Sequence, residues 1–290
     1  KNIKIDIEYT NQADLKSPIK TIQILDDGYG VPFNEFDNRI LEIGTTAKQK
    51  GQGIGRFSSL QIGELMHIET IGYDLEKKTF TKTQFSIDTT DFNNAQLENT
   101  EFKVDYEYLD GKHKPYYKVK IEQLHHNKQE KLPKRNKIHE YFLEDKINQA
   151  VFEHYPYEIF HNTVDFIING VTLKREDFVI GTPSKKRIEY VDKKGKKHEL
   201  IFYFYNIKSS LNKVKVFFQT DNAGLKSVAH EYTYSSDWFT PDLGTWFIYI
   251  ESPLLNSDLF RNLDLETLGE VEIKNIKNKI KESINNFFKA

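Results

Sequence analysis

The stretch Ile22-Gln23-Ile24-Leu25-Asp26-Asp27-Gly28-Tyr29-Gly30 decides how the rest of this sequence is interpreted. It begins as a largely apolar run, which is typical of a strand. The run ends at Asp26, the first residue of an Asp-x-Gly-x-Gly pattern. Gly28 and Gly30 carry no side chain, so the chain can turn tightly and a ligand can approach the backbone. The stretch therefore predicts a strand that ends in a binding turn.

A second glycine cluster follows in Gly51-Gln-Gly53-Ile54-Gly55-Arg56-Phe57. Phe57 and Leu60 are spaced like one face of a short helix. A glycine loop that opens a helix presents free N–H groups and the positive end of the helix dipole, and both favour phosphate. Between the two clusters, the apolar residues from Phe36 to Ile43 have the spacing of a short amphipathic helix.

Two other phosphate-binding motifs fit this region less well. A dinucleotide fingerprint needs Gly-x-Gly-x-x-Gly, whereas the glycines here stand at 51, 53 and 55. A P-loop ends in Gly-Lys-Ser/Thr, and Gly55-Arg56-Phe57 does not supply that ending. The structural alternative is a strand, a turn and a flexible glycine linker with no ligand.

In this order and spacing, the residues resemble the nucleotide site of the GHKL ATPases, the superfamily of gyrase, heat-shock chaperones, histidine kinases and MutL. Ile43-Gly-Thr45-Thr46-Ala-Lys48 is especially similar to the chaperone branch, and Gly53 to Phe57 is similar to large bacterial ATP-binding proteins related to it. The resemblance implies an α+β fold. A Bergerat-type α/β sandwich that binds ATP is expected at 1–153, and a smaller α/β transducer-like domain at 154–290.

The resemblance also assigns roles to residues. Asp26 would accept a hydrogen bond from the exocyclic amine of adenine, and Gly28 and Gly30 would shape the base pocket. The phosphates would be held by Gly51, Gly53, Ile54, Gly55, Arg56 and Phe57. The ATP lid, Val31 to Lys50, would close over them with Thr45, Thr46 and Lys48, and we expect it to become ordered when nucleotide binds.

Two features depart from the family pattern. GHKL enzymes carry a helix with a general-base Glu and a magnesium-binding Asn before the first strand, but Lys1 to Tyr9 already alternates like the strand that follows it. We therefore expect no catalytic residue and no protein ligand for Mg²⁺ in this chain, and Mg²⁺ would bind through ATP and that upstream helix. The Gly-Thr that supports adenine has two candidates, Thr100 by chemistry and Tyr117 by position.

The second half resembles, by position, the transducer domain that sends a basic residue to the γ-phosphate. Lys226, at the end of the loop Asp221 to Lys226, is the best candidate, and a surface lysine after a turn is the alternative. Alternating or helically spaced apolar residues predict the other elements of the chain. Strands are expected at 3–9, 21–25, 65–73, 79–87, 102–108, 116–123, 164–168, 171–173, 188–191, 198–205, 214–219 and 244–251, and helices at 138–152 and 269–288.

Composition narrows the function. The 290 residues contain 41 Lys plus Arg and 43 Asp plus Glu, so the net charge of −2 argues against a nucleic-acid coat or a membrane-surface protein. The stretch His125 to Lys137 is basic, but its interleaved polar residues favour a solvated loop over a DNA patch. The chain has no cysteine, which excludes disulfides and thiolate metal sites. It has no signal peptide and no apolar run long enough for a membrane, so a cytoplasmic protein is expected. Its richness in Lys, Asn and Ile is typical of an AT-rich bacterial genome.

Two functions follow from the resemblance. The first is the ATP-binding module of a GHKL ATPase, chaperone-like or MutL-like, in which nucleotide closes the lid and pairs two protomers as a homodimer. Client protein or DNA would then bind through other domains, and the full-length protein would be the ATPase. The second is a nucleotide-sensing or structural interaction module without turnover, for example in DNA repair or defence.

Overall fold

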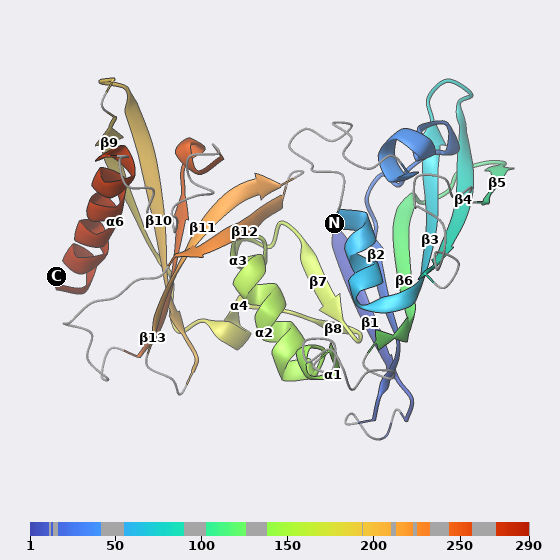
Figure 1. Ribbon diagram of the computed structural model, residues 1–290, viewed down its shortest axis with the longest axis horizontal. Coiled ribbons are helices and arrows are strands. Elements are labelled where there is room, and N and C mark those ends of the chain that lie inside the picture. Colours follow the sequence, from blue (N-terminus) through green and yellow to red (C-terminus); the bar gives the residue numbers. More distant parts are fainter. Residues whose placement is uncertain are drawn as a thin grey trace. The chain divides into compact units, whose positions relative to one another are not determined.

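The computed structural model describes residues 1–11, 13, 17–41, 55–89, 103–125, 138–192, 194–209, 213–222, 225–232, 244–256 and 271–289. The chain divides into two compact units (Figure 1). Unit 1 contains residues 1–151 and 158–173, and unit 2 contains residues 152–157 and 174–290. The sequence predicted a single crossing at residue 153, whereas the chain leaves unit 1, returns to it and leaves again.

Unit 1 is built on an eight-stranded sheet with the strand order β5-β4-β3-β6-β2-β1-β7-β8. All neighbouring strands are antiparallel except β1 and β7, which pair in parallel. The strands are β1 (Asn2–Tyr9), β2 (Ile19–Asp26), β3 (Gly63–Asp74), β4 (Thr79–Asp88), β5 (Val104–Leu109), β6 (Tyr116–Leu124), β7 (Asp165–Ile168) and β8 (Val171–Thr172). The return of the chain to unit 1 has a physical cause in the ladder between β7 and β1, which joins Asn2–Ile5 to Asp165–Ile168.

The two faces of this sheet differ in chemistry. Residues directly opposite one another on antiparallel strands share a face, so the registers identify each side. One face contains the buried Ile7, Ile22, Ile121 and Met66 in a cross-strand row. The other contains polar side chains in the same way, such as Asp6, Gln23, Lys120 and His67. We call these the apolar face and the polar face.

Three short helices lie between β6 and β7 in the chain. They are α1 (Ile138–Tyr141), α2 (Glu144–His154) and α3 (Pro156–His161). The expected helix at 138–152 is therefore broken after Tyr141, and Pro156 begins α3. Proline is favoured in the first turn of a helix because its missing N–H has no partner there anyway. The turn Asn169-Gly170 joins β7 to β8 with positive φ at both residues, as its sequence predicts.

Unit 2 is built on a five-stranded sheet with the order β12-β11-β13-β10-β9. The helix α6 (Val271–Lys289) packs on one face through Ile276, Ile280 and Ile284 (Figure 1). The strands are β9 (Ser184–Val191), β10 (Lys197–Ile207), β11 (Val214–Asn222), β12 (Leu225–Tyr232) and β13 (Thr245–Glu251), and the remaining helix is α4 (Arg175–Phe178).

The second face of this sheet is also buried. The alternation of Trp246, Ile248 and Ile250 predicted one buried face for β13, but Phe247 and Tyr249 on the other side are fully buried too. The cover comes from residues 152–157, because Phe152 packs edge-on against Tyr205 and the Tyr249 hydroxyl donates to the Glu153 carbonyl. A strand buried on both faces reads as a continuous apolar run rather than an alternating one.

Candidate functional site

Asp26 stands at the end of β2, on the apolar face of the eight-stranded sheet. Its register partners are Ile3 on β1 and Tyr117 on β6. The carboxylate is half-buried, and its Oδ1 atom accepts a 3.0 Å hydrogen bond from the Gly28 N–H. This bond is a local turn of the kind that aspartate makes two residues on. A Cβ on Gly28 would lie 2.7 Å from that Oδ1 atom, so glycine is needed for this turn.

The neighbouring Asp27 is engaged differently. The Asn2 backbone N–H and side-chain amide each donate a 2.6 Å hydrogen bond to the Asp27 carboxylate. Burial alone would raise the pKa of Asp27, but these two bonds outweigh it and hold the pKa below its usual value. Asp27 therefore ties the turn to the start of β1.

The chain after Asp26 lies directly on β3. Gly30 has a φ of 63°, and a Cβ there would lie 1.8 Å from the Ile71 carbonyl oxygen. On the other side of this contact, a Cβ on Gly72 would lie 2.3 Å from the Pro32 nitrogen. Only glycine fits at either position, because no side chain can occupy the space between two touching backbones. The sequence pointed to Gly30 but not to Gly72.

Two buried threonines fix the residues that follow the turn. The Thr70 hydroxyl accepts a 2.8 Å hydrogen bond from the Val31 N–H, and the Thr81 hydroxyl accepts one of the same length from the Phe33 N–H. Both side chains are fully buried. Sequence reasoning missed them, although a polar residue at a buried position of an alternating strand is a signal that could have pointed to both.

The start of the expected lid packs onto the apolar face. Phe36 and Ile40 are buried against Met66, Ile68 and Phe85, as the helical spacing predicted. The local structure is a 3₁₀ helix at Phe33–Glu35 followed by a wider π-type turn at Asp37–Leu41. This packing holds the beginning of the lid in place next to Asp26 and its turn.

Comparison with known proteins identifies this arrangement. Residues 1–114 match the family described as histidine kinase-, DNA gyrase B-, and HSP90-like ATPase. This part of the chain is therefore similar to the GHKL ATPases. The match confirms the resemblance that residues 22–57 carry, and the α+β fold class is confirmed with it.

A solved structure extends the likeness in fold. The crystal structure of the N-terminal domain of a DNA repair protein has a TM-score of 0.52 to this chain at 12% sequence identity. The alignment covers 99% of this chain and 89% of the other. At this identity the likeness concerns the fold alone. The search of curated proteins gave no match.

Several predicted nucleotide residues of the GHKL domain lie outside the described part of the chain. These are Thr45, Thr46, Lys48, Gly51, Gly53, Ile54 and Thr100. Gly55, Arg56 and Phe57 begin a 3₁₀ helix that runs to Gln61, at the place where a short helix was predicted. The end of that helix is fixed to the sheet, because a ring nitrogen of the buried His125 lies 2.9 Å from the Leu60 carbonyl oxygen.

Tyr117 and Lys226 lie within the described part of the chain. Their roles in binding nucleotide stay predictions. Tyr117 on β6 is the cross-strand partner of Asp26. Lys226 lies in unit 2, where its ammonium is 2.7 Å from a Glu251 carboxylate oxygen. The same ammonium lies 4.1 Å from the centroid of the Tyr157 ring.

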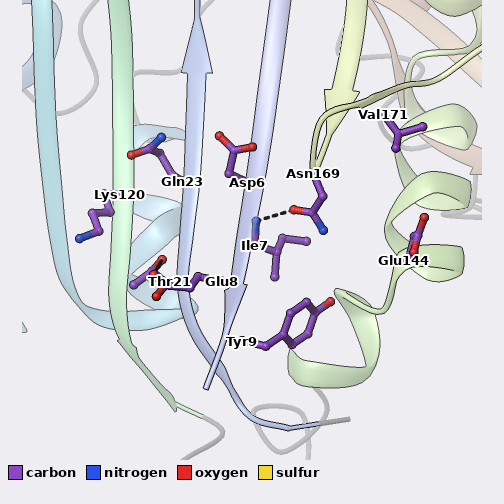
Figure 2. A pocket seen from close by; sticks show the side chains of 10 residues that line it. All are labelled: Asp6, Ile7, Glu8, Tyr9, Thr21, Gln23, Lys120, Glu144, Asn169 and Val171. Carbon is purple, nitrogen blue, oxygen red and sulfur yellow. Dashed lines mark hydrogen bonds between the residues drawn. The ribbon is translucent and has the colours of Figure 1, made fainter. Parts of the chain in front are cut away.

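A cavity of about 700 Å³ lies elsewhere in unit 1 (Figure 2). It is lined by residues from both faces of β1, by polar-face residues of β2 and β6, by the first residue of α2, and by the turn and strand at Asn169 and Val171. These are Asp6, Ile7, Glu8, Tyr9, Thr21, Gln23, Lys120, Glu144, Asn169 and Val171. None of these residues belongs to the turn from Asp26 to Gly30, so this cavity and that turn are formed by different residues.

Two further tests apply to the described residues. Among them, no three His, Asp or Glu side chains come together in a way that would hold a metal ion. None of the described helices is long and apolar enough to cross a bilayer.

Proposed function

We propose that this chain is an ATP-binding module in which nucleotide closes a lid and brings protomers together. The observation that carries the proposal is the half-buried Asp26 at the end of β2, followed by a turn that only glycines allow, inside a GHKL domain. Bound ATP would supply the phosphate charge that orders the lid and the oxygens that bring Mg²⁺ to the site.

The base would be recognised by hydrogen bonding to Asp26. A carboxylate accepts hydrogen bonds and donates none, so at the C6 substituent of a purine it accepts from the amine of adenine and repels the carbonyl oxygen of guanine. The Gly28 N–H holds one carboxylate oxygen in a fixed orientation before any ligand arrives. A preoriented acceptor of this kind lowers the entropy cost of binding.

The phosphates would be held by the second glycine cluster, from Gly51 to Phe57. Thr45, Thr46 and Lys48 would close the lid over them, while Phe36 and Ile40 stay packed on the sheet. Closure of this kind is a common way in which a ligand controls association between subunits. A homodimer in the nucleotide-bound state, with client protein or DNA held by other domains, is part of the proposal.

Calorimetric titration of ATP into the protein and into Asp26→Asn tests the base site. The amide of asparagine keeps the size of aspartate but loses the charge. We expect the affinity to fall about tenfold or more, because a hydrogen bond to a charged group contributes ~1.5–3 kcal/mol.

The matched control is Asp27→Asn. It changes the adjacent carboxylate, which is bonded to Asn2 and not aimed at the base site, so ATP affinity is expected to change less than Asp26→Asn changes it. Equal losses in the two variants, or no binding of ATP by the unchanged protein, would rule out the base site proposed here.

Hydrogen exchange tests the lid. We expect residues 44–56 to gain protection when a non-hydrolysable ATP analogue binds, whereas Phe36 and Ile40 are expected to be protected in both states because they are buried. Equal protection of 44–56 with and without the analogue would mean that this segment does not respond to nucleotide.

A module that senses nucleotide without turnover is the second candidate. The uncertain Gly-Thr site supports it, because Tyr117, one of the two candidates for that site, is a bulky aromatic residue opposite Asp26. Single-turnover measurement with radiolabelled ATP separates the two functions. Binding without phosphate release, in the longest native form of the protein, supports the sensor, and release at a steady rate supports the ATPase.

A further inference from the structure

A row of three threonines crosses β3 and β4 on the apolar face. Thr70 on β3 is directly opposite Thr83 on β4, and Thr81 follows on the same side of β4. All three side chains are fully buried. Hydroxyl groups at buried positions need partners, because burying one without a hydrogen bond costs free energy. The partners of each hydroxyl therefore show what the row does.

Thr70 on β3 bonds both the segment after the turn and the strand β6. Its hydroxyl accepts the 2.8 Å bond from the Val31 N–H and donates a 2.8 Å bond to the Tyr116 carbonyl on β6. Val31 directly follows the Gly28–Gly30 turn, and Tyr116 directly precedes Tyr117, the cross-strand partner of Asp26. One hydroxyl thus connects the far end of the turn to the strand beside the carboxylate.

The backbone around this hydroxyl cannot adjust easily. Gly30 touches both the Ile71 carbonyl and the Tyr116 carbonyl, since a Cβ there would lie 1.8 Å and 2.9 Å from their oxygens. The turn is therefore held at both ends. Asp26 bonds its first part, and Thr70 bonds Val31, the residue that follows it. Loss of the Thr70 hydroxyl would leave the buried Val31 N–H without its acceptor, and the segment would have to move to find another.

We propose that Thr70 is a positioning residue for the base pocket, one that fixes the Gly28–Gly30 turn against Asp26 without touching the nucleotide. This inference rests on the proposed ATP function and names a residue of the same site. Thr81 makes a bond of the same kind and length, but to Phe33, which lies beyond the turn. Thr70 therefore acts where the turn of the pocket meets the first residue of the lid, and Thr81 acts two residues further into the lid.

The third threonine supplies a control within the same row. Thr83 is fully buried, and its hydroxyl has no hydrogen-bond partner among the described residues. Removing this hydroxyl gives up no bond, so Thr83→Val is expected to keep both the fold and ligand affinity. The row thus contains one hydroxyl at the pocket, one at the lid and one at neither.

The experiment measures binding of adenosine, ADP and ATP to the full chain and to Thr70→Val, Thr81→Val and Thr83→Val, together with thermal stability. Valine has the shape of threonine without the hydroxyl. For Thr70→Val we expect about a tenfold loss for all three ligands, because the base end is common to them and a lost buried bond costs ~1–3 kcal/mol. Thr81→Val is expected to lower stability by a similar amount but to keep adenosine affinity within about twofold.

A merely structural Thr70 gives a different pattern. If Thr70→Val and Thr81→Val weaken adenosine equally, or if Thr70→Val is destabilised yet binds adenosine as the unchanged protein does, the inference is wrong. Thr70→Ser keeps the hydroxyl and is expected to restore affinity. Failure of the unchanged protein to bind adenosine or ATP would instead contradict the proposed function itself, so the two failures are distinguishable.

If Thr70→Val does not fold, amide hydrogen exchange at Val31 in the unchanged protein tests the inference instead. In the unchanged protein, adenosine is expected to slow exchange of the Val31 N–H, because the pocket and the bond to Thr70 stabilise each other. Exchange at Val31 that is the same with and without saturating adenosine would overturn the inference.

Discussion

The two sheets use their faces differently, and this difference separates the site from its scaffold. In unit 1, the apolar face carries Asp26 and the turn, while the opposite face carries polar side chains such as Glu69 and Lys118. In unit 2, the central strands β10 and β13 are buried on both faces, by α6 on one side and by residues 152–157 on the other. A sheet with one covered face keeps its strand ends accessible, whereas a sheet covered on both faces gains stability but offers little surface to a ligand.

Among the substitutions considered, truncation of a buried aromatic residue in the sheet of unit 2 is expected to cause the largest loss of stability. Phe204 is fully buried, and its ring stacks on Phe287 of α6 with centroids 3.8 Å apart. Phe204→Ala is expected to lower the free energy of unfolding of unit 2 by about 3–5 kcal/mol, the usual cost of a large cavity. Urea denaturation measures this.

The matching substitution on the polar face of unit 1 is Gln84→Ala. Gln84 is exposed and donates to Glu69. We expect it to cost about 1 kcal/mol or less, as most surface substitutions do. Similar losses in the two variants would mean that burial on both faces does not distinguish the sheets.

Substituting the glycine that touches β3 should have the next largest effect. Gly30→Ala meets the Ile71 carbonyl at 1.8 Å and has a positive φ, whereas Gly111→Ala has a positive φ and open space around it. Gly30→Ala is therefore expected to cost ~1–3 kcal/mol more than Gly111→Ala, the usual cost of overpacking. Thermal unfolding of the two variants gives the difference, and equal costs would show that the turn does not lie tightly on β3.

The sequence predicted unit 1 better than unit 2 for a physical reason. Strands with one solvent-exposed face alternate between apolar and polar residues, and this alternation can be recognised in the sequence. The predicted strands at 3–9 and 65–73 accordingly lie within the observed β1 and β3. The strand β13 is apolar on both sides, and its second buried face could not be seen because its cover comes from residues 152–157. Alternation is visible in a sequence, but the identity of a covering segment is not.

The same contrast applies to the site. Asp26, Gly28 and Gly30 stand within five residues and form a local pattern that a sequence displays. Thr70 and Thr81 bond to backbone groups 39 and 48 residues away, so their role depends on how β3 and β4 lie under the turn. The sequence signal was only a polar residue at a position where alternation calls for an apolar one.

Acid should destabilise the polar face through Glu69. Burial alone would raise its pKa, but hydrogen bonds from Lys118, Tyr116 and Gln84 outweigh it and lower the pKa from 4.5 to about 2. A carboxylate whose pKa is lower in the folded state stabilises the protein above its unfolded pKa. This stability is therefore lost as the pH falls from about 4.5 towards about 2.

Glu69→Gln isolates that contribution. It is expected to lower stability at pH 7 by about 1–2 kcal/mol, with allowance for partial exposure to water, and to flatten the dependence of stability on pH below 4.5. Denaturation measured at a series of pH values decides the matter. An unchanged pH profile in Glu69→Gln would assign the acid sensitivity to other carboxylates.

The smallest expected effect concerns Lys226, which tests whether unit 2 contributes to the nucleotide site. Its ammonium is held by the Glu251 carboxylate, and both side chains are about a quarter exposed. Ion pairs that are partly exposed to water contribute ~0.2–1 kcal/mol to the free energy of unfolding, so Glu251→Gln should barely change stability. If Lys226 binds the γ-phosphate, Glu251 competes with ATP for it, and Glu251→Gln should then raise ATP affinity by up to about fivefold without changing ADP affinity.

Lys226→Met should lower ATP affinity and also leave ADP affinity unchanged. Glu199→Gln, which removes the exposed partner of Arg187 on β9, is the matched control and should change neither. If the ratio of ATP to ADP affinity is the same in all three variants, Lys226 belongs to the scaffold, and the two sheets differ in function as completely as they do in burial.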